Sequence, residues 1–134
     1  VNMGIEPFLV TSSTIAIQAQ RLVRRLCKVC KQEYTPDIES LVELGLDAEK
    51  HRGRTVFRQV GCDKCAQRGY HSRSGIFELL VMTPRIQELA LRGVDSNNIK
   101  REARKEGMRT LREDGLQKAA LGVTSLDEIF RVVA

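Results

Sequence analysis

Several features are absent from this 134-residue sequence, and each absence excludes a class of function. There is no Trp, and aromatic residues make up only 4% of the chain, so stacking platforms for single-stranded nucleic acid are not expected. No apolar run approaches the ~20 residues that span a bilayer. The motifs G-x-x-x-x-G-K-[ST], G-x-S-x-G and H-E-x-x-H do not occur, so neither a phosphate-binding loop nor a hydrolase signature is present in these residues.

The composition is that of an ordinary soluble domain. Apolar residues make up 42% and charged residues 29% of the chain. The formal net charge of +5 permits an acidic partner without requiring one. The apolar stretch at Pro7-Phe8-Leu9-Val10 follows very little preceding chain, whereas natural N-termini are usually polar and mobile. We therefore expect the sequence to be a piece of a longer protein.

Four cysteines are present in two pairs, Cys27 with Cys30 and Cys62 with Cys65. Each pair has the C-x-x-C spacing, which lets two thiolates reach one ion from a single tight turn. Two such turns supply the four soft ligands that tetrahedral Zn²⁺ prefers. Four sulfurs leave no open coordination position for water, so we predict a structural zinc site without a catalytic role.

Other roles for the cysteines fit less well. A disulfide framework needs an oxidising compartment, which nothing in these residues indicates. A thioredoxin-like redox site would use one C-x-x-C pair and leave the other unused. Buried thiols without a metal have no reason for such regular spacing. Since four thiolates complete the shell, His51 and His71 are expected to be surface residues. Nearby cations are expected to offset the charge of the site, namely Lys28, Lys31, Lys64 and Arg68.

A basic stretch leads into the first cysteine pair. Residues 7–17 are predicted to form a helix and residues 18–26 a strand. The strand and the turn after it contain no acidic residue. They carry five cations, Arg21, Arg24, Arg25, Lys28 and Lys31. Such a run is usually a solvated face, and an anion-binding patch is the alternative.

Glu78 interrupts an apolar run that follows the second cysteine pair. Residues 69–75 are expected to form a turn or loop, and residues 76–82 a strand buried on both faces. A bare carboxylate is costly to bury. Glu78 is therefore expected either to form a buried ion pair with Arg21, Arg24 or Arg25, or to lie on a solvent-facing edge.

The remaining segments predict an α+β fold. Between the cysteine pairs, Thr35-Pro36 is expected to begin a short helix that stops at Gly45, and residues 55–60 to form a strand. Helix starts are predicted at Thr83-Pro84, at Asp95 or Ser96, and at the capping boxes Thr110-x-x-Glu113 and Ser125-x-x-Glu128. We predict a small sheet carrying a zinc-binding insert, followed by a bundle of short helices. The expected regions are residues 1–26, the tetracysteine insert 27–65, and a returning strand with a helical subdomain, 66–134.

Longer segments of the sequence are more specific than the cysteines. They are MGIEPFLV (3–10), AQRLVRRLC (19–27), RSGIFELL (73–80), GMRTLREDGL (107–116) and GVTSLDE (122–128). In order and spacing they resemble the secretion ATPases of type II secretion and type IV pilus assembly, and the opening segment is most similar to the type II branch. The family's zinc-binding tetracysteine motif matches Cys27, Cys30, Cys62 and Cys65.

This resemblance implies the C-terminal part of a hexameric, RecA-like ring ATPase that drives pseudopilus or pilus assembly. Residues 1–26 would be the end of its ATPase core. The family's Walker A loop, Walker B acids and histidine box would lie upstream of Val1, so ATP and Mg²⁺ belong to the longer protein. We expect this chain alone to be inactive. Expected partners are neighbouring ring subunits and inner-membrane platform proteins, at the cytoplasmic face of the bacterial inner membrane.

A function of a different class also fits the sequence. The chain could be a free-standing zinc module that binds nucleic acid through the basic strand. Such binding would weaken steeply with salt, whereas a motor fragment would show no specific affinity for nucleic acid. The sequence leaves open which secretion system is served, what the insert contacts and whether the isolated chain oligomerises.

Overall fold

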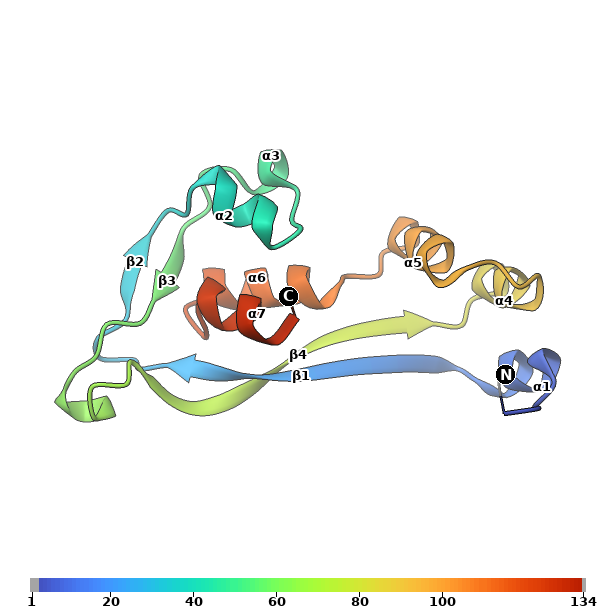
Figure 1. The fold of residues 1–134 in the computed structure, drawn as a ribbon, viewed down its shortest axis with the longest axis horizontal. Helices are drawn as coiled ribbons and strands as arrows, with labels where there is room; N and C mark the ends of the chain where they lie inside the picture. The colour runs from blue at the N-terminus through green and yellow to red at the C-terminus, as the bar shows by residue number, and fades with distance from the viewer. Residues whose placement is uncertain (1–2, 134) are drawn as a thin grey trace. The chain divides into compact units, whose positions relative to one another are not determined.

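The computed structural model describes residues 3–133, and these residues form the predicted mixed α+β fold (Figure 1). Short helices and strands follow one another along the chain. The helices are α1 (Pro7–Ser13), α2 (Ile38–Glu43), α3 (Ala48–His51), the 3₁₀ helix η1 (Asp63–Cys65), α4 (Pro84–Leu91), α5 (Ser96–Lys105), α6 (Leu111–Ala120) and α7 (Leu126–Val133). The strands are β1 (Ala16–Leu26), β2 (Gln32–Tyr34), β3 (Val56–Arg58) and β4 (Tyr70–Val81).

The strands of the described residues form two separate two-stranded sheets. β2 and β3 are antiparallel, with Tyr34 opposite Val56, and both lie between the two cysteine pairs in the sequence. β1 and β4 are neighbours in the other sheet. Just beyond their ends, the Cys27 N–H donates to the Gly69 carbonyl at 2.9 Å. Both cysteine pairs are therefore attached to the same strand pair.

The chain divides into two compact units, each with its own core. Unit 1 comprises residues 1–19 and 78–110, and unit 2 comprises residues 20–77 and 111–134. The four C-terminal helices pack as two pairs, α4 with α5 in unit 1 and α6 with α7 in unit 2. The core of unit 1 is small and contains Ile86, Leu89 and Ala103. The core of unit 2 is larger and contains Leu41, Leu44, Leu46, Val56, Leu116, Ala119, Leu126 and Ile129.

Several predicted helix starts in the C-terminal half are confirmed by their caps. The Thr83 hydroxyl accepts a hydrogen bond from the Ile86 N–H at 3.3 Å. Of the two candidates for α5, Asp95 is the cap, and its carboxylate accepts from the Asn98 N–H at 2.9 Å. Side-chain oxygens at these positions satisfy backbone donors that have no partner inside the helix. Local sequence therefore determines where α4 and α5 begin.

Two helix boundaries in the N-terminal half differ from the prediction. α1 ends at Ser13 rather than residue 17, because the hydroxyls of Ser13 and Thr14 bond to carbonyls one turn back and the chain then extends into β1. α2 begins after Asp37 rather than Thr35. The Asp37 carboxylate accepts from the Ser40 N–H at 2.8 Å, which makes it the stronger cap.

The prediction for residues 69–75 is also wrong, because β4 already begins at Tyr70. Ser72 has a φ of 64°, so one residue in a left-handed conformation is accommodated inside the strand. Nor is the apolar run of β4 buried on both faces. Ile76 is fully buried, but Phe77 is 40% exposed and Leu79 is 48% exposed. Side chains of a strand alternate between two faces, and here only one face is well covered.

His51 is buried rather than on the surface, with 8% of its surface exposed. Its Nδ1 lies 3.3 Å from Nη1 of Arg54. Burial, with help from the neighbouring cations Arg54 and Lys50, lowers the pKa of His51. His51 is not among the residues that cluster as metal ligands.

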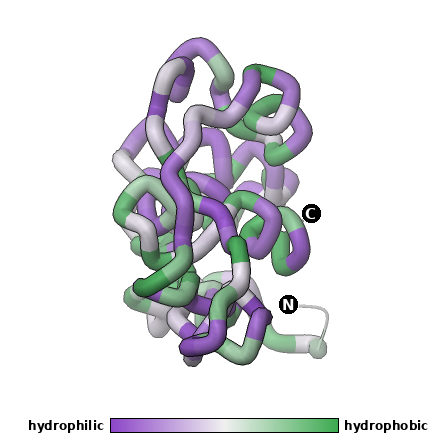
Figure 2. Tube along the Cα trace, turned by 90° about the vertical axis from the view of Figure 1, so that its left-hand side faces the viewer, coloured by the Kyte–Doolittle hydropathy of each residue, from purple (hydrophilic) through white to green (hydrophobic). Residues whose placement is uncertain are grey.

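Hydrophobic and hydrophilic residues alternate over short stretches of the chain, as Figure 2 shows. In the part of the chain that the structure describes, no helix is long and apolar enough to cross a membrane.

Candidate metal centre

The four cysteines come from two tight turns. Cys27 and Cys30 follow β1, Cys62 directly precedes η1, and Cys65 is the last residue of η1. Gly61 has a φ of 114°, and a Cβ at this position would lie 3.0 Å from the Gln67 carbonyl oxygen, so the turn requires glycine here. Ala66 and Gln67 then adopt left-handed conformations, with φ of 54° and 63°. These two residues reverse the chain so that the following backbone returns to the cysteines.

The four sulfurs lie within 4.8 Å of one another. The Sγ–Sγ distances are 3.8 Å for Cys27–Cys62, 3.9 Å for Cys30–Cys65 and 3.7 Å for Cys62–Cys65. A disulfide would require about 2 Å, so the cysteines are free thiols. A tetrahedron with Zn–S bonds of about 2.3 Å has edges of about 3.8 Å. The dimensions of the cluster therefore fit a tetrahedrally coordinated metal ion.

Backbone N–H groups point at the sulfurs. The Gly69 N–H donates to Cys65 Sγ at 3.2 Å, and the Gly61 N–H donates to Cys30 Sγ at 3.3 Å. Burial raises the pKa of Cys65, but N–H donors from Cys62 and Gly69 outweigh it and bring the pKa to about 6. Such donors favour the thiolate, which is the form that binds metal.

The other cysteines differ in their surroundings. Backbone N–H groups of Cys30 and Val29 lower the pKa of Cys27. For Cys62 burial dominates and raises the pKa to about 11. A bound cation would favour the deprotonated form at all four positions. The assignment of all four as zinc ligands stays a prediction, which this geometry fits.

The cations expected to offset the charge of the cluster have separate roles. Lys31 Nζ donates to the Gly122 carbonyl at 3.1 Å and lies 4.9 Å from the centre of the Phe57 ring. Lys31 therefore links the first turn to the end of α6. Lys64 and Arg68 are exposed beside the second turn and remain available for the role that the sequence predicted.

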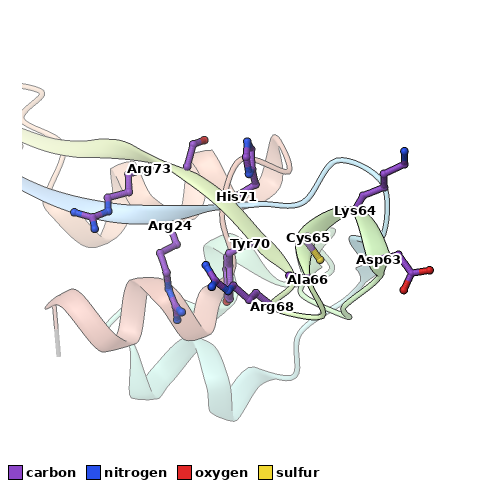
Figure 3. Close-up of a pocket in the computed structure, with 10 residues that line it drawn as sticks. Arg24, Asp63, Lys64, Cys65, Ala66, Arg68, Tyr70, His71 and Arg73 are labelled. Carbon is purple, nitrogen blue, oxygen red and sulfur yellow. The ribbon is translucent and has the colours of Figure 1, made fainter.

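A groove of about 660 Å³ opens beside Cys65. Arg24, Arg68 and Arg73 are among its lining residues, and Figure 3 shows the Arg24 side chain beside Tyr70. The Arg24 guanidinium lies 4.3 Å from the centre of the Tyr70 ring, a cation–π contact. Of the three arginines in the predicted basic strand, Arg24 lines this groove, whereas Arg21 and Arg25 do not.

The sequence identified Glu128 only as a capping residue, whereas the structure shows that its carboxylate is buried and binds two arginines. Its side chain is 1% exposed and accepts two guanidinium hydrogen bonds from Arg24, at 3.2 and 3.0 Å, and two from Arg131, both at 2.8 Å. The Arg24 backbone N–H donates to it as well, at 2.6 Å. Although burial raises the pKa of Glu128, hydrogen bonds from Arg131 and Arg24 outweigh it and lower the pKa to about 2.

The predicted capping box at the start of α7 is therefore only half formed. Ser125 Oγ accepts from the Glu128 N–H at 3.1 Å, but the Glu128 carboxylate binds arginines instead of returning to the helix start. Arg24 and Glu128 are 104 residues apart in the sequence, and no local pattern connects them. Only the fold could reveal this pair.

The ion pair predicted for Glu78 concerns a different carboxylate from Glu128. Glu78 lies in unit 1, where its Oε1 is 3.8 Å from Lys100 Nζ, and its side chain is 22% exposed. Its predicted pairing with Arg21, Arg24 or Arg25 stays a prediction. The carboxylate that binds Arg24 in unit 2 is Glu128.

Known proteins similar to this chain are secretion and pilus proteins. A family model described as "Type II/IV secretion system protein" matches residues 1–131. The type IV pilus assembly ATPase PilB of Thermus thermophilus is 44% identical over 96% of this chain and 14% of its own length. PilB of Myxococcus xanthus is 42% identical over 96% of this chain and 23% of its own length. The type II secretion system ATPase E of Vibrio cholerae is 40% identical over 98% of this chain and 25% of its own length.

Proposed function

The chain belongs to the type II/IV secretion system protein family, and we propose that it is the C-terminal part of an ATPase that powers type II secretion or type IV pilus assembly. The observation that supports this proposal is the family match over residues 1–131, together with relatives that are named as ATPases of these two systems. The chain spans between 14% and 25% of the length of these relatives. ATP hydrolysis, with bound ATP and Mg²⁺, is therefore proposed for the longer protein.

The relatives do not distinguish the two branches of the family. Identities of 44% and 42% to pilus ATPases compare with 40% to a type II secretion ATPase. Placement in the type II branch, which the opening segment suggested, stays a prediction.

We further propose that Cys27, Cys30, Cys62 and Cys65 bind one structural Zn²⁺. The Sγ–Sγ distances of 3.7–3.9 Å support this proposal, as do the N–H groups directed at Cys30 and Cys65. A metal held by four thiolates has no open position for water and supplies only cross-linking. The cysteines would thus join the turn after β1 to the turn before β4, around an insert whose β2–β3 ribbon is only three residues long on each strand.

The family resemblance also underlies the proposed setting. We propose that the longer protein is a hexamer at the cytoplasmic face of the bacterial inner membrane. In this setting the chain would contact neighbouring subunits of the ring and platform proteins of the membrane. It contains no phosphate-binding loop, so it would serve assembly and coupling while the ATP site lies elsewhere in the longer protein.

The proposal is tested by comparing the longer protein with the 134-residue chain. We expect the longer protein to form rings and hydrolyse ATP, and the chain alone to bind one zinc ion without hydrolysing ATP. Ring formation is measured by mass photometry, hydrolysis by phosphate release and zinc by elemental analysis. A Cys62→Ser, Cys65→Ser double variant is the control for metal binding. ATP hydrolysis by the chain alone, or a metal-free chain with disulfide-linked cysteines, would contradict the proposal.

A further inference from the structure

Two adjacent grooves in unit 2 share Arg24 and Arg73. The first, of about 660 Å³, lies beside Cys65, and the second, of about 420 Å³, also includes Arg131. Their cations come from β1, the turn after η1, β4 and α7, which are far apart in the sequence. The fold therefore concentrates positive charge that the sequence distributes over more than 100 residues.

The two grooves have a local excess of positive charge. They are lined by five permanently cationic side chains, Arg24, Lys64, Arg68, Arg73 and Arg131. The acids that face these groups are Asp63, in the lining, and the buried Glu128, which both Arg24 and Arg131 contact. Counting these side chains alone, the cations exceed the acids by three, and a Zn²⁺ held by four thiolates beside Cys65 would offset two of the three.

Hydrogen-bond donors of these arginines remain unused. Arg24 and Arg131 each bind Glu128 through Nε and Nη2, so their Nη1 atoms make no hydrogen bond within residues 3–133. Arg68 and Arg73 have no side-chain hydrogen bond or ion pair to any residue that the structure describes. Guanidinium groups present planar forks of donors that match phosphate oxygens.

Two arginines of the groove are fixed before any ligand arrives. Glu128 is 1% exposed and holds Arg24 and Arg131 by paired hydrogen bonds, and the Tyr70 ring lies against Arg24. The Tyr70 hydroxyl is itself held by Ser125 Oγ at 2.7 Å. A binding site whose groups are already ordered loses less entropy when a ligand binds.

The backbone around the groove is also unusual. The non-glycine residues Ala66 and Ser72 line it with φ of 54° and 64°. Such conformations cost free energy and are concentrated at ligand-binding sites in proteins. Here they lie on either side of Arg68 and Tyr70 in the sequence.

We propose that the two grooves together bind a phosphate-bearing ligand, either a free phosphate compound or the headgroup of an anionic lipid, through Arg68, Arg73 and the Nη1 atoms of Arg24 and Arg131. Compensation of the thiolate cluster explains Lys64 and Arg68 but not the second groove, whose lining contains no cysteine. In the second groove three arginines face one carboxylate, so two positive charges remain there, which match a doubly charged phosphate group better than a single carboxylate.

Binding is measured on the zinc-loaded 134-residue chain with sodium tripolyphosphate, by calorimetry at low salt. Tyr70 provides a local signal, because the chain has no Trp and only one other Tyr, which a Tyr34→Phe background removes. Losing charged hydrogen bonds should weaken binding about 10- to 100-fold in Arg68→Gln or in Arg73→Gln. The matched control is Arg21→Gln, on the same strand as Arg24 but outside both grooves, which should change affinity less than about twofold.

The source of the phosphate is distinguished with vesicles. Sedimentation with phosphatidylglycerol vesicles, lost in Arg73→Gln and displaced by tripolyphosphate, would support a lipid headgroup. Tripolyphosphate binding without vesicle binding would support a free phosphate compound. Unchanged zinc content and circular dichroism verify that each variant is folded.

Three results would overturn the proposal. The first is no tripolyphosphate binding at low salt. The second is an equal loss of affinity in Arg21→Gln and Arg73→Gln, which would indicate a general effect of net charge. The third is binding of a DNA duplex that tripolyphosphate does not displace, which would favour nucleic acid instead.

Discussion

The two units of this chain are held together by different means. Unit 1 has a core of three buried apolar residues, and two of its helices, α4 and α5, begin at the capped positions Thr83 and Asp95. Its ion pair between Arg92 and Glu88 is exposed, and the pair between Lys100 and Glu78 is partly buried on the Glu78 side. Unit 2 has a larger apolar core and adds the four-cysteine cluster and the buried carboxylate of Glu128. Unit 1 also joins distant segments, since α1 packs against α4, but the thiolate cluster and the buried carboxylate belong to unit 2.

This difference determines how each unit should respond to its surroundings. Helix caps and small apolar cores do not require a metal ion. A thiolate cluster requires a metal ion, and a buried carboxylate requires its charge. Stability that depends on metal or on the charge of a buried carboxylate should therefore be concentrated in unit 2, and hydrogen exchange can measure it residue by residue.

Removal of the metal should have the largest effect. Structural zinc sites contribute on the order of 10 kcal/mol of apparent binding free energy, so chelation or Cys65→Ser should strongly reduce amide protection around both turns and in β2 and β3. Amides in α4 and α5 should keep most of their protection. Hydrogen exchange with and without a chelator, followed by mass spectrometry, measures both regions in one experiment.

Ser74→Ala is a suitable control for the cysteine variant, because it removes a similar polar group from β4 outside the cluster. Equal loss of protection in α5 and in β2 after chelation would show that the two units do not differ in this respect. Unchanged protection around Cys27 and Cys62 would remove the argument that the cluster stabilises the fold.

Glu128→Gln should have the second largest effect on stability, and the size of this effect should depend on pH. The folded pKa of about 2 is below the ordinary 4.5, so the charged form stabilises the fold above pH 4.5 and this stabilisation is lost as pH falls from 4.5 to 2. The difference corresponds to roughly 3 kcal/mol. Urea unfolding at pH 7 and at pH 3 should therefore show a large gap between wild type and variant at pH 7 and a smaller gap at pH 3.

The comparison of wild type and variant at each pH isolates Glu128 from other titrating groups. His51, whose pKa is lowered by burial, loses stabilisation as pH falls below about 6.5 in both proteins, so its contribution cancels. A gap of the same size at pH 7 and pH 3 would mean that the carboxylate charge is not what stabilises unit 2.

The contrast between the units also explains what sequence could predict. Thr83, Asp95 and Gly45 act within one helical turn of their position, and the sequence located Thr83 and Gly45 and left Asp95 and Ser96 as alternatives. The C-x-x-C spacing is likewise local, so two ligand turns could be recognised from four residues each. Patterns of this kind need no knowledge of the fold.

Contacts between distant residues could not be predicted in this way. Glu128 looked like a capping residue because Ser125 precedes it by three positions, yet its carboxylate binds Arg24 from the other end of the chain. Asp114 lies in the first turn of α6, where an acid suits the helix start, and its carboxylate accepts the Phe77 N–H at 2.8 Å. In both residues the carboxylate makes a tertiary contact that the local pattern does not indicate.

Loss of a helix cap in unit 1 should have a smaller effect. Asp95→Ala removes the acceptor for the Asn98 N–H, and such a loss costs about 1 kcal/mol. Protection should fall in the first turn of α5 and remain unchanged in α7. Asp95→Asn, which retains a capping oxygen, should recover most of the loss, whereas a decrease of equal size in α7 would argue against local stabilisation of unit 1.

The smallest effects are expected from one exposed ion pair in each unit. Arg52 and Glu49 in unit 2 are 3.0 Å apart with 60% and 78% of their side chains exposed, and Arg92 and Glu88 in unit 1 are 3.6 Å apart with 63% and 54% exposed. Pairs this open to water contribute only a few tenths of a kcal/mol.

Arg52→Gln and Arg92→Gln should therefore each change the free energy of unfolding by less than about 0.5 kcal/mol, as measured by urea unfolding. Small changes in both variants would mean that exposed ion pairs contribute equally little to the two units. The difference between the units would then lie in the buried position of Glu128. If Arg52→Gln lowered the free energy of unfolding nearly as much as Glu128→Gln, and Arg92→Gln did not, exposed as well as buried ion pairs would stabilise unit 2.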